Sequence, residues 1–229
     1  MGAHLQREIE NLKKKILSMG AQVEETVNKA VEALETRDPS LAQQVIDGDE
    51  ALDNAEVEIE EECLKILALH QPVAIDLRYV IAVLKINNDL ERIGDLAVNI
   101  AERAAYLATH APVEVPLDFR GMVERTKRMV SDSLNALVNV DTHLARHVRA
   151  ADDEVDIINR NMFAIIQDYI ARHPERVAES LHLLSASRHL ERIADQATNI
   201  AEDVIYMVEG EIVRHQPEDF TDSHSAPKA

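Results

Sequence analysis

The 229-residue chain contains no tryptophan, and aromatic residues make up only 3% of it. Glycine and proline are also scarce, with six and seven residues. Because strands favour aromatic and β-branched residues and turns need glycine and proline, this shortage excludes a sheet-rich fold with many short connections. Alanine, leucine, isoleucine and glutamate are abundant instead, and 46% of the residues are hydrophobic. The composition therefore predicts an all-α protein with long helices and a real core.

Cysteine and long apolar segments are almost absent as well. The single cysteine, Cys63, cannot form an internal disulfide, and we expect it to be a small buried side chain. No apolar run approaches the roughly 20 residues that a membrane span needs. Residues 1–20 lack the apolar core of a signal peptide. The expected location is the cytoplasm, without direct membrane insertion.

Positive charge is the third shortage. The chain has 24 lysines and arginines against 42 aspartates and glutamates, so its net charge is −18. Nucleic acid and anionic lipid are therefore poor partners, since both carry dense negative charge. Cations or a basic protein surface are the partners that this charge favours.

Prolines and glycines separate six long segments with helical periodicity. Asp38 precedes Pro39 as an N-cap precedes a proline at the first helical position, and Asp141 is the equivalent cap of the fifth segment. Residues from about 216 onward are polar and predict a loose tail. The predicted helices are residues 5–36, 39–69, 74–110, 117–139, 142–172 and 175–210.

An internal repeat organises these helices. Residues 90–102 match residues 190–202 at 10 of 13 positions, with an offset of 100. A second match at an offset of 103 pairs Asp49 with Asp152 and Asp53 with Asp156. The offset changes in the loop after the second helix of each half. The chain is thus predicted to form two tandem antiparallel three-helix bundles, residues 1–112 and 113–215, followed by a flexible tail, residues 216–229.

Each copy of the repeat places a stripe of oxygen-bearing side chains on one face of its third helix, within about 80° on a helical wheel. Apolar residues lie on the opposite face. The same sector is apolar further upstream, for example at Leu77 and Leu181, which predicts that a neighbour covers it. The stripe consists of Glu91, Asp95, Asn99 and Glu102 in the first copy and Glu191, Asp195, Asn199 and Glu202 in the second.

The second and fifth helices carry matching acids, Asp49 with Asp53 and Asp152 with Asp156. Antiparallel neighbours can bring these acids toward the stripe. Such oxygen ligands suit hard cations, whereas zinc would be expected to recruit histidine or cysteine.

A solvated or salt-bridged face is the alternative explanation of the stripe. Arg92, Arg188 and Arg192 lie near the acids in sequence and can neutralise some of them. Repulsion between carboxylates four residues apart costs a few tenths of a kcal/mol per pair. The retention of these pairs in both copies favours a compensating cation.

Enzyme signatures are missing from the chain. A ferritin-like di-iron site needs two Glu-x-x-His pairs, and only one is present, Glu179 with His182, facing away from the stripe. No phosphate-binding glycine loop and no nucleophile–histidine set is found. We therefore expect no enzyme and no catalytic residues; a carboxylate-bridged metalloenzyme is the remotest of the alternatives.

Several segments resemble the signature of the PhoU family, and the similarity extends over about residues 3–213. The resemblance implies two three-helix bundles and acidic motifs that bind multinuclear iron or zinc clusters in some members. Ala194 and Gln196 replace the glycine and histidine of many members, so one ligand is absent from the second site. The segments are Gln71-Pro72-Val73-Ala74, Asp76-Leu77-Arg78, Leu84-Lys85-Ile86 and Asp89-Leu90-Glu91-Arg92-Ile93-Gly94-Asp95.

The resemblance also implies a function. PhoU proteins couple a phosphate ABC transporter ATPase to a membrane sensor histidine kinase and repress the phosphate-starvation response when phosphate is plentiful. We expect the same negative regulation here, and a homodimer. The alternative is a metal-storing or metal-sensing bundle. The expected cofactor is a metal cation, iron before zinc, manganese, magnesium or calcium, at Asp49, Asp53, Glu91, Asp95, Asn99, Asp152, Asp156, Glu191, Asp195 and Asn199.

Overall fold

The computed structural model describes residues 3–115 and 117–213, which contain seven α-helices, one short 3₁₀ helix and no strand. The predicted all-α fold is confirmed. None of the helices in these two stretches combines the length and the apolar character that crossing a membrane requires. The helices are α1 (Ala3–Thr36), α2 (Pro39–Asp47), α3 (Asp49–His70), α4 (Ala74–Ala108), α5 (Phe119–Asn139), α6 (Thr142–Arg172), the 3₁₀ helix η1 (Pro174–Arg176) and α7 (Val177–Glu209).

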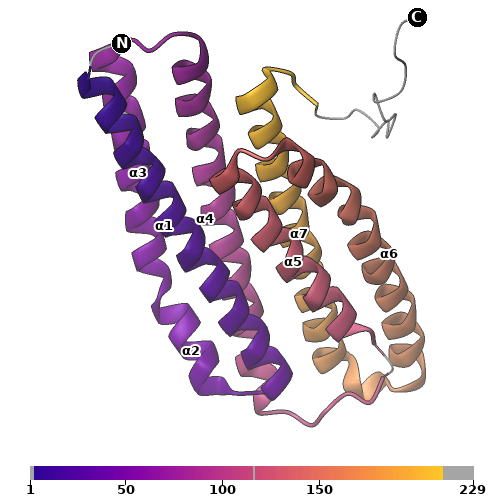
Figure 1. The fold of residues 1–229 in the computed structure, drawn as a ribbon. Helices are drawn as coiled ribbons and strands as arrows, with labels where there is room; N and C mark the ends of the chain where they lie inside the picture. Colours follow the sequence, from indigo (N-terminus) through magenta and orange to yellow (C-terminus); the bar gives the residue numbers. More distant parts are fainter. Residues whose placement is uncertain (1–2, 116, 214–229) are drawn as a thin grey trace, which may run out of the picture.

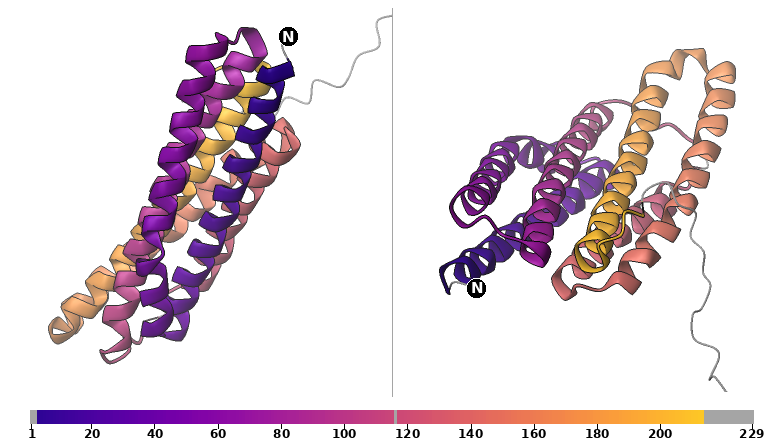
Figure 2. Two further views of the ribbon diagram at one scale, coloured as in Figure 1. Left: turned by 90° about the vertical axis from the view of Figure 1, so that its left-hand side faces the viewer. Right: turned by 90° about the horizontal axis from the view of Figure 1, so that it is seen from above.

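The helices form two bundles that lie side by side (Figures 1 and 2). Helices α1, α2, α3 and α4 pack together in the first bundle, and α5, α6 and α7 in the second. The two bundles meet where α4 packs against α7 and α1 packs against α5. Helices α3 and α6 lie at opposite outer edges (Figure 1). The predicted pair of tandem bundles is thus confirmed, with α2 and α3 together in the place of the second helix of the first bundle.

The predicted N-caps are present at both repeat-equivalent positions. The Asp38 carboxylate accepts hydrogen bonds from the backbone N–H groups of Ser40 and Leu41 at 2.8 and 3.2 Å. The Asp141 carboxylate accepts the equivalent bonds from His143 and Leu144, both at 3.0 Å. These caps satisfy donors that the first helical turn leaves open, and they fix where α2 and α6 begin.

The single helix predicted over residues 39–69 is wrong, because α2 ends and α3 begins around Gly48. The repeat equivalent of Gly48 is Ala151, which lies inside the uninterrupted helix α6. Glycine costs about 1 kcal/mol relative to alanine in a helix interior, so the first half breaks where the second continues. The predicted helix at 175–210 starts as η1, and the predicted tail, residues 216–229, lies outside the described residues.

The core lies on the side of α4 and α7 opposite the acidic stripes. Ile93, Ile100, Ile193 and Ile200 are fully buried there. Cys63 is buried as expected, and burial raises the pKa of its thiol to about 12. These positions confirm the helical period that the sequence indicates.

The expectation that the apolar sector upstream of each stripe is covered is wrong at its ends. Leu77 is 39% exposed and Leu181 is 51% exposed. Helical periodicity gives the direction of a side chain relative to its own helix, but whether a neighbour reaches it depends on the tertiary arrangement. Leu77 lies in the first turn of α4 and Leu181 in the second turn of α7.

Helices α4 and α7 are antiparallel and are related by a pseudo-twofold axis. Lys85 Nζ lies 3.0 Å from an Asp203 carboxylate oxygen, and Arg103 Nε donates to Ser185 Oγ at 3.3 Å. Lys85 is the repeat equivalent of Ser185, and Arg103 is that of Asp203. The two contacts are therefore the same contact on either side of the axis.

A small exchange of volume distinguishes the two halves at the acidic motifs. A Cβ atom on Gly94 would lie 2.9 Å from the Leu52 Cδ1 atom of α3. In the second half the equivalent residues are Ala194 and Val155, both fully buried. One half pairs the larger side chain with glycine, and the other pairs the smaller side chain with alanine.

We expect Gly94→Ala and Leu52→Val to compensate each other. Overpacking and cavity formation each cost about 1 kcal/mol or more, while alanine returns up to about 1 kcal/mol of helix propensity at Gly94. The free energy of unfolding of the double variant should therefore be about 1 kcal/mol higher than the value obtained by adding the changes of the two single variants. Chemical denaturation of all four proteins measures this coupling. Strictly additive changes would show that the two side chains do not compete for one space.

Candidate functional site

The first acidic site lies between α3 and α4. Asp49 and Asp53 come from α3, and Glu91 and Asp95 come from α4. Burial raises the pKa of the Asp49 carboxyl, and the charges of Asp53 and Asp95 raise it further. Repulsion across the two helices shows that the predicted acids face one another.

Glu91, like Asp49, is half-buried, whereas Asp53 and Asp95 are exposed. Burial raises the pKa of the Glu91 carboxyl, followed by the charges of Asp95, Asp53 and Glu56, and Arg92 partly opposes them. Glu56 is missing from the predicted metal ligands, although it shares the helical sector of Asp53. Because the charge of Glu56 raises the pKa of Glu91, Glu56 belongs to the first site, which is then a cluster of five carboxylates.

The second site lies between α6 and α7 and is more deeply placed. The pKa of the Asp152 carboxyl is raised to about 6 by burial and by the charges of Asp195 and Asp156, while a hydrogen bond with the Thr198 side chain lowers it. Burial and Asp195 raise the pKa of Glu191. The four predicted acids of the second half are therefore also brought together.

The two sites differ in their nearby positive charge. Arg188 and Arg192 both lower the pKa values of Glu191 and Asp195 against the effect of burial. The first site has only Arg92 in this role, because Asn88 stands at the position equivalent to Arg188. The position equivalent to Glu56 is an amide, Asn159, which accepts a hydrogen bond from Ser187 Oγ at 3.1 Å. The first site is thus the more negative of the two, a difference that a residue-by-residue comparison of the repeats can reveal.

The amides at the end of each predicted ligand set use their nitrogen atoms within α4 and α7. Asn99 Nδ2 donates to the Asp95 backbone carbonyl at 2.7 Å, and Asn199 Nδ2 donates to Gln196 Oε1 at 3.5 Å. Each bond uses the donor of the amide and leaves the acceptor oxygen as the atom suited to a cation.

The acidic stripe is not uniform along its length. Glu102 and Glu202 pair with Arg103 and Arg149 at 3.6 and 3.3 Å. Of the eight acids predicted as metal ligands, only Asp156 has an ion pair within the described residues, with Arg160 at 3.9 Å. The stripe therefore ends in salt bridges, and its central acids are left without them.

The donor set fits a hard cation better than zinc. All the facing groups are carboxylates, and the nearby histidines have other contacts: His182 stacks on the Tyr106 ring at 3.7 Å, and His189 Nε2 lies 3.2 Å from Ser185 Oγ. Within residues 3–115 and 117–213, no three histidine, cysteine or acidic side chains are arranged to hold a metal ion. The carboxylates face one another without a preformed cage, so ligation requires their side chains to rotate.

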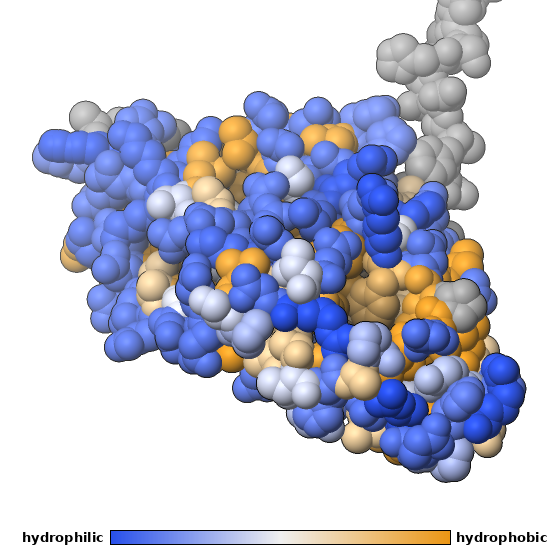
Figure 3. Space-filling model, turned by 90° about the horizontal axis from the view of Figure 1, so that it is seen from below, coloured by the Kyte–Doolittle hydropathy of each residue, from blue (hydrophilic) through white to orange (hydrophobic). Residues whose placement is uncertain are grey.

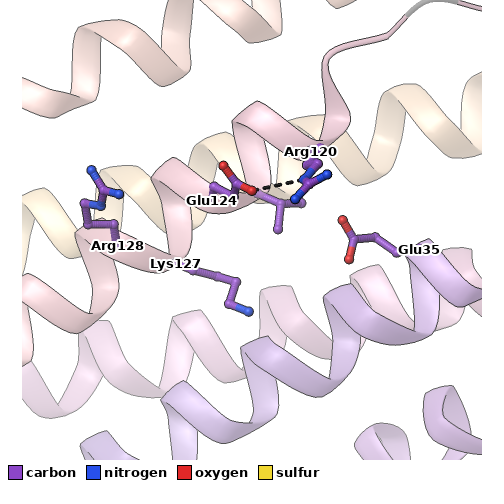
Figure 4. A pocket seen from close by; sticks show the side chains of 6 residues that line it. Glu35, Arg120, Glu124, Lys127 and Arg128 are labelled. Carbon is purple, nitrogen blue, oxygen red and sulfur yellow. Dashed lines mark hydrogen bonds and ion pairs between the residues drawn. The ribbon is translucent and has the colours of Figure 1, made fainter.

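An open cavity of about 550 Å³ between α1 and α5 is a different kind of feature (Figure 4). Arg120 is paired with Glu124 at 3.1 Å, Glu35 approaches from α1, and Arg128 points away from Glu35 in Figure 4. Its lining carries charges of both signs and offers neither a nucleophile nor a convergent anion site. The paired acidic sites remain the better candidates for function.

Known proteins match this chain over nearly its whole described length. The model of the PhoU domain matches residues 16–104 and again residues 119–204. A phosphate-specific transport system accessory protein PhoU homolog from Aquifex aeolicus is 42% identical, covering 92% of this chain and 95% of that protein. A Pseudomonas aeruginosa protein of the same description is 40% identical, covering 91% of this chain and 86% of its own.

Solved structures agree with these relatives. The crystal structure of PhoU from Pseudomonas aeruginosa has a TM-score of 0.87 at 39% identity, covering 90% of this chain and 99% of that one. The phosphate transport system regulatory protein PhoU from Streptococcus pneumoniae has a TM-score of 0.81 at 29% identity, covering 91% and 99%. With the duplicated domain, the shared fold and relatives of this identity together, the chain belongs to the PhoU family.

Proposed function

We propose that this protein is a cytoplasmic accessory regulator of a phosphate-specific transport system and represses phosphate-starvation signalling when phosphate is plentiful. The observation that carries the proposal is the 42% identity over 92% of the chain to a protein with that accessory description. The acting partners are the transporter ATPase and the membrane sensor histidine kinase. Regulation proceeds by protein contacts without catalysis, by a protein that forms homodimers.

The role is tested in a deletion strain. We expect phosphate-scavenging genes to be expressed at high phosphate in the deletion strain and to be repressed again when the native gene is restored. Reporter expression at high and low phosphate measures this. Normal repression in the deletion strain would overturn the regulatory role.

The acidic sites are proposed to bind hard cations, iron foremost. Asp49, Asp53, Glu91 and Asp95 supply carboxylates to one site, and Asp152, Asp156, Glu191 and Asp195 to the other. Asn99 and Asn199 add neutral oxygens. The support is that Asp49, Glu91 and Asp152 are partly desolvated and are repelled by the acids that face them. Within the described residues, Asp156 alone of the eight acids has an ion pair. The same observations favour the second candidate function, a metal-storing or metal-sensing bundle.

A bound cation should raise the melting temperature of the native protein, since ions that bind only the folded state stabilise it by mass action. We expect Glu91→Ala/Asp95→Ala to lose most of this shift. The matched control is Glu32→Ala/Glu35→Ala, which removes two exposed acids of α1. Thermal unfolding with Fe³⁺, Mn²⁺, Mg²⁺, Ca²⁺ or Zn²⁺ measures the shifts. No shift with any ion would leave the stripe a solvated face, and equal shifts in all three proteins would place the ion elsewhere.

Without metal, stability should fall as pH rises through the titration range of Asp152. Its carboxyl has a pKa of about 6 in the folded protein against an ordinary value of 3.8, so the folded state binds this proton more tightly than the unfolded state. Stability is therefore highest below about pH 4 with respect to this group and is lost between about pH 4 and 6. Asp152→Asn should flatten that loss, and the exposed neighbour change Asp153→Asn should not. Urea unfolding with a chelator from pH 4 to 7 tests this; equal pH profiles would contradict it.

A further inference from the structure

Large apolar side chains are exposed where α3 turns into α4. We call this surface, residues 57–77, the α3–α4 corner. Leu69 is 67% exposed and Val73 is 73% exposed. Among the other large apolar side chains of the described residues, only Ile212, after the end of α7, is as exposed as Leu69. At least half of each of Val57, Leu64 and Ile75 is exposed as well. On α3 itself, Val57 and Leu64 lie within about 20° on a helical wheel, on the side away from the core, whereas Leu69, in the last turn, lies about 140° from Leu64.

The second half of the repeat lacks this apolar surface. Its equivalent positions are polar or charged in each case, and the α6–α7 connection reads Arg172, His173, Pro174, Glu175 and Arg176. The two corners lie at opposite ends of the molecule (Figure 1). The repeat equivalents of Val57, Leu64, Leu69, Val73 and Ile75 are Arg160, Gln167, Arg172, His173 and Glu175.

The polar corner shows that the fold does not need apolar residues at this turn. Figure 3 looks onto the end with the α6–α7 connection: hydrophilic side chains cover most of it, and apolar ones gather on the right-hand side, which is the side of the second bundle. Leu181 belongs to α7 at that end and is half exposed, and Ile157 and Phe163 of α6 are exposed elsewhere in the second half. Five positions are therefore apolar and exposed in the first half and polar or charged in the second. We take this difference to indicate that the first half alone contacts a partner here.

The backbone of the α3–α4 corner differs from its equivalent too. Gln71 and Ala74 have φ values of 46° and 51°, in the left-handed region that side chains with a Cβ rarely adopt. Residues 173–176 of the other connection include no positive φ. Pro72 between the two strained residues is buried, so the turn is held in place and presents Val73 and Ile75 outward.

The surroundings of the corner are strongly acidic. Helix α3 carries eight acids against one lysine. That lysine, Lys65, is already engaged by Glu8 and Glu62 at 3.8 and 3.3 Å, and His70 Nε2 lies 2.6 Å from a Glu8 carboxylate oxygen. A partner that covers the corner must therefore bring an apolar centre and a basic rim.

This charge selects among possible occupants. A second copy of the chain would place two acidic α3 helices against each other, and an anionic lipid surface would be repelled in the same way. A basic protein surface is attracted, and attraction of this kind weakens as salt screens it.

We propose that the α3–α4 corner is the surface on which the transporter ATPase docks, through an apolar patch ringed by lysine and arginine. The inference rests on the proposed function, in which that ATPase is a partner, and adds the place and the chemistry of the contact. The second half contributes no equivalent contact, so one ATPase subunit binds each chain at this corner.

The repeat supplies its own test variant. Leu64→Gln/Leu69→Arg/Val73→His/Ile75→Glu gives four of the five corner positions the side chains of the second half, which folds with them. The added Arg and Glu cancel in charge. The reciprocal control is Ile157→Asn/Phe163→Glu on α6, at side chains 52% and 54% exposed. Binding of each purified protein to purified transporter ATPase is measured by interferometry at low and high salt, with melting temperatures to verify folding.

We expect the corner variant to bind the ATPase at least about tenfold more weakly, as loss of an interface centre does, and the α6 control to bind within about twofold of the native protein. Native binding should weaken at high salt. If the native protein binds no ATPase, the transporter role and this inference both fail. If the native protein and the corner variant bind equally, or the control loses as much, the inference alone is wrong. It is equally wrong if the corner changes abolish only binding to the kinase or only self-association measured by light scattering.

Discussion

The packing of α4 against α7 is the contact on which the rest of the molecule depends. Asp203 is almost fully buried in it, and a buried carboxylate is tolerated only with a partner such as Lys85 at 3.0 Å. That pair fixes the register of the two helices, and the pseudo-twofold axis places Arg103 against Ser185 in the same register. With the apolar faces of α4 and α7 directed into the core, both acidic stripes must face outward, where α3 and α6 meet them.

Much of this arrangement could be predicted because it is encoded locally and twice. The caps at Asp38 and Asp141 and the spacing of isoleucines along α4 and α7 depend on neighbours within a few turns. The break at Gly48 and the exposure of Leu77 could not be predicted in the same way. A single glycine is tolerated in many helices, and the exposure of a side chain at a helix start depends on whether a distant helix reaches it.

Some features of the candidate site could be predicted from the sequence in the same way, and others could not. Helical spacing was enough to place Glu91 and Asp95 opposite Asp49 and Asp53, because antiparallel neighbours of known face leave few alternatives. The balance of charge was harder, since it depends on where long side chains such as Arg188 extend. Within the described residues the carboxylates face one another without converging on one point. Helical spacing cannot predict this, because convergence depends on the side-chain rotamers. Sequence therefore predicts which acids meet, and the metal ions proposed to bind there would decide how they ligate.

The joining of both halves in one polypeptide has a consequence for how such a protein can evolve. In a symmetric pair of identical half-chains, every substitution would appear at both ends at once, and a corner suited to one neighbour would be duplicated at the other pole. Here Leu69 can be leucine while its counterpart Arg172 is arginine, and Gly94 can be glycine while Ala194 is alanine. When the two copies are joined in one chain, the shared core can stay the same while the surface side chains at each end of the molecule change independently. The two ends therefore differ in their surfaces although their folds are equivalent.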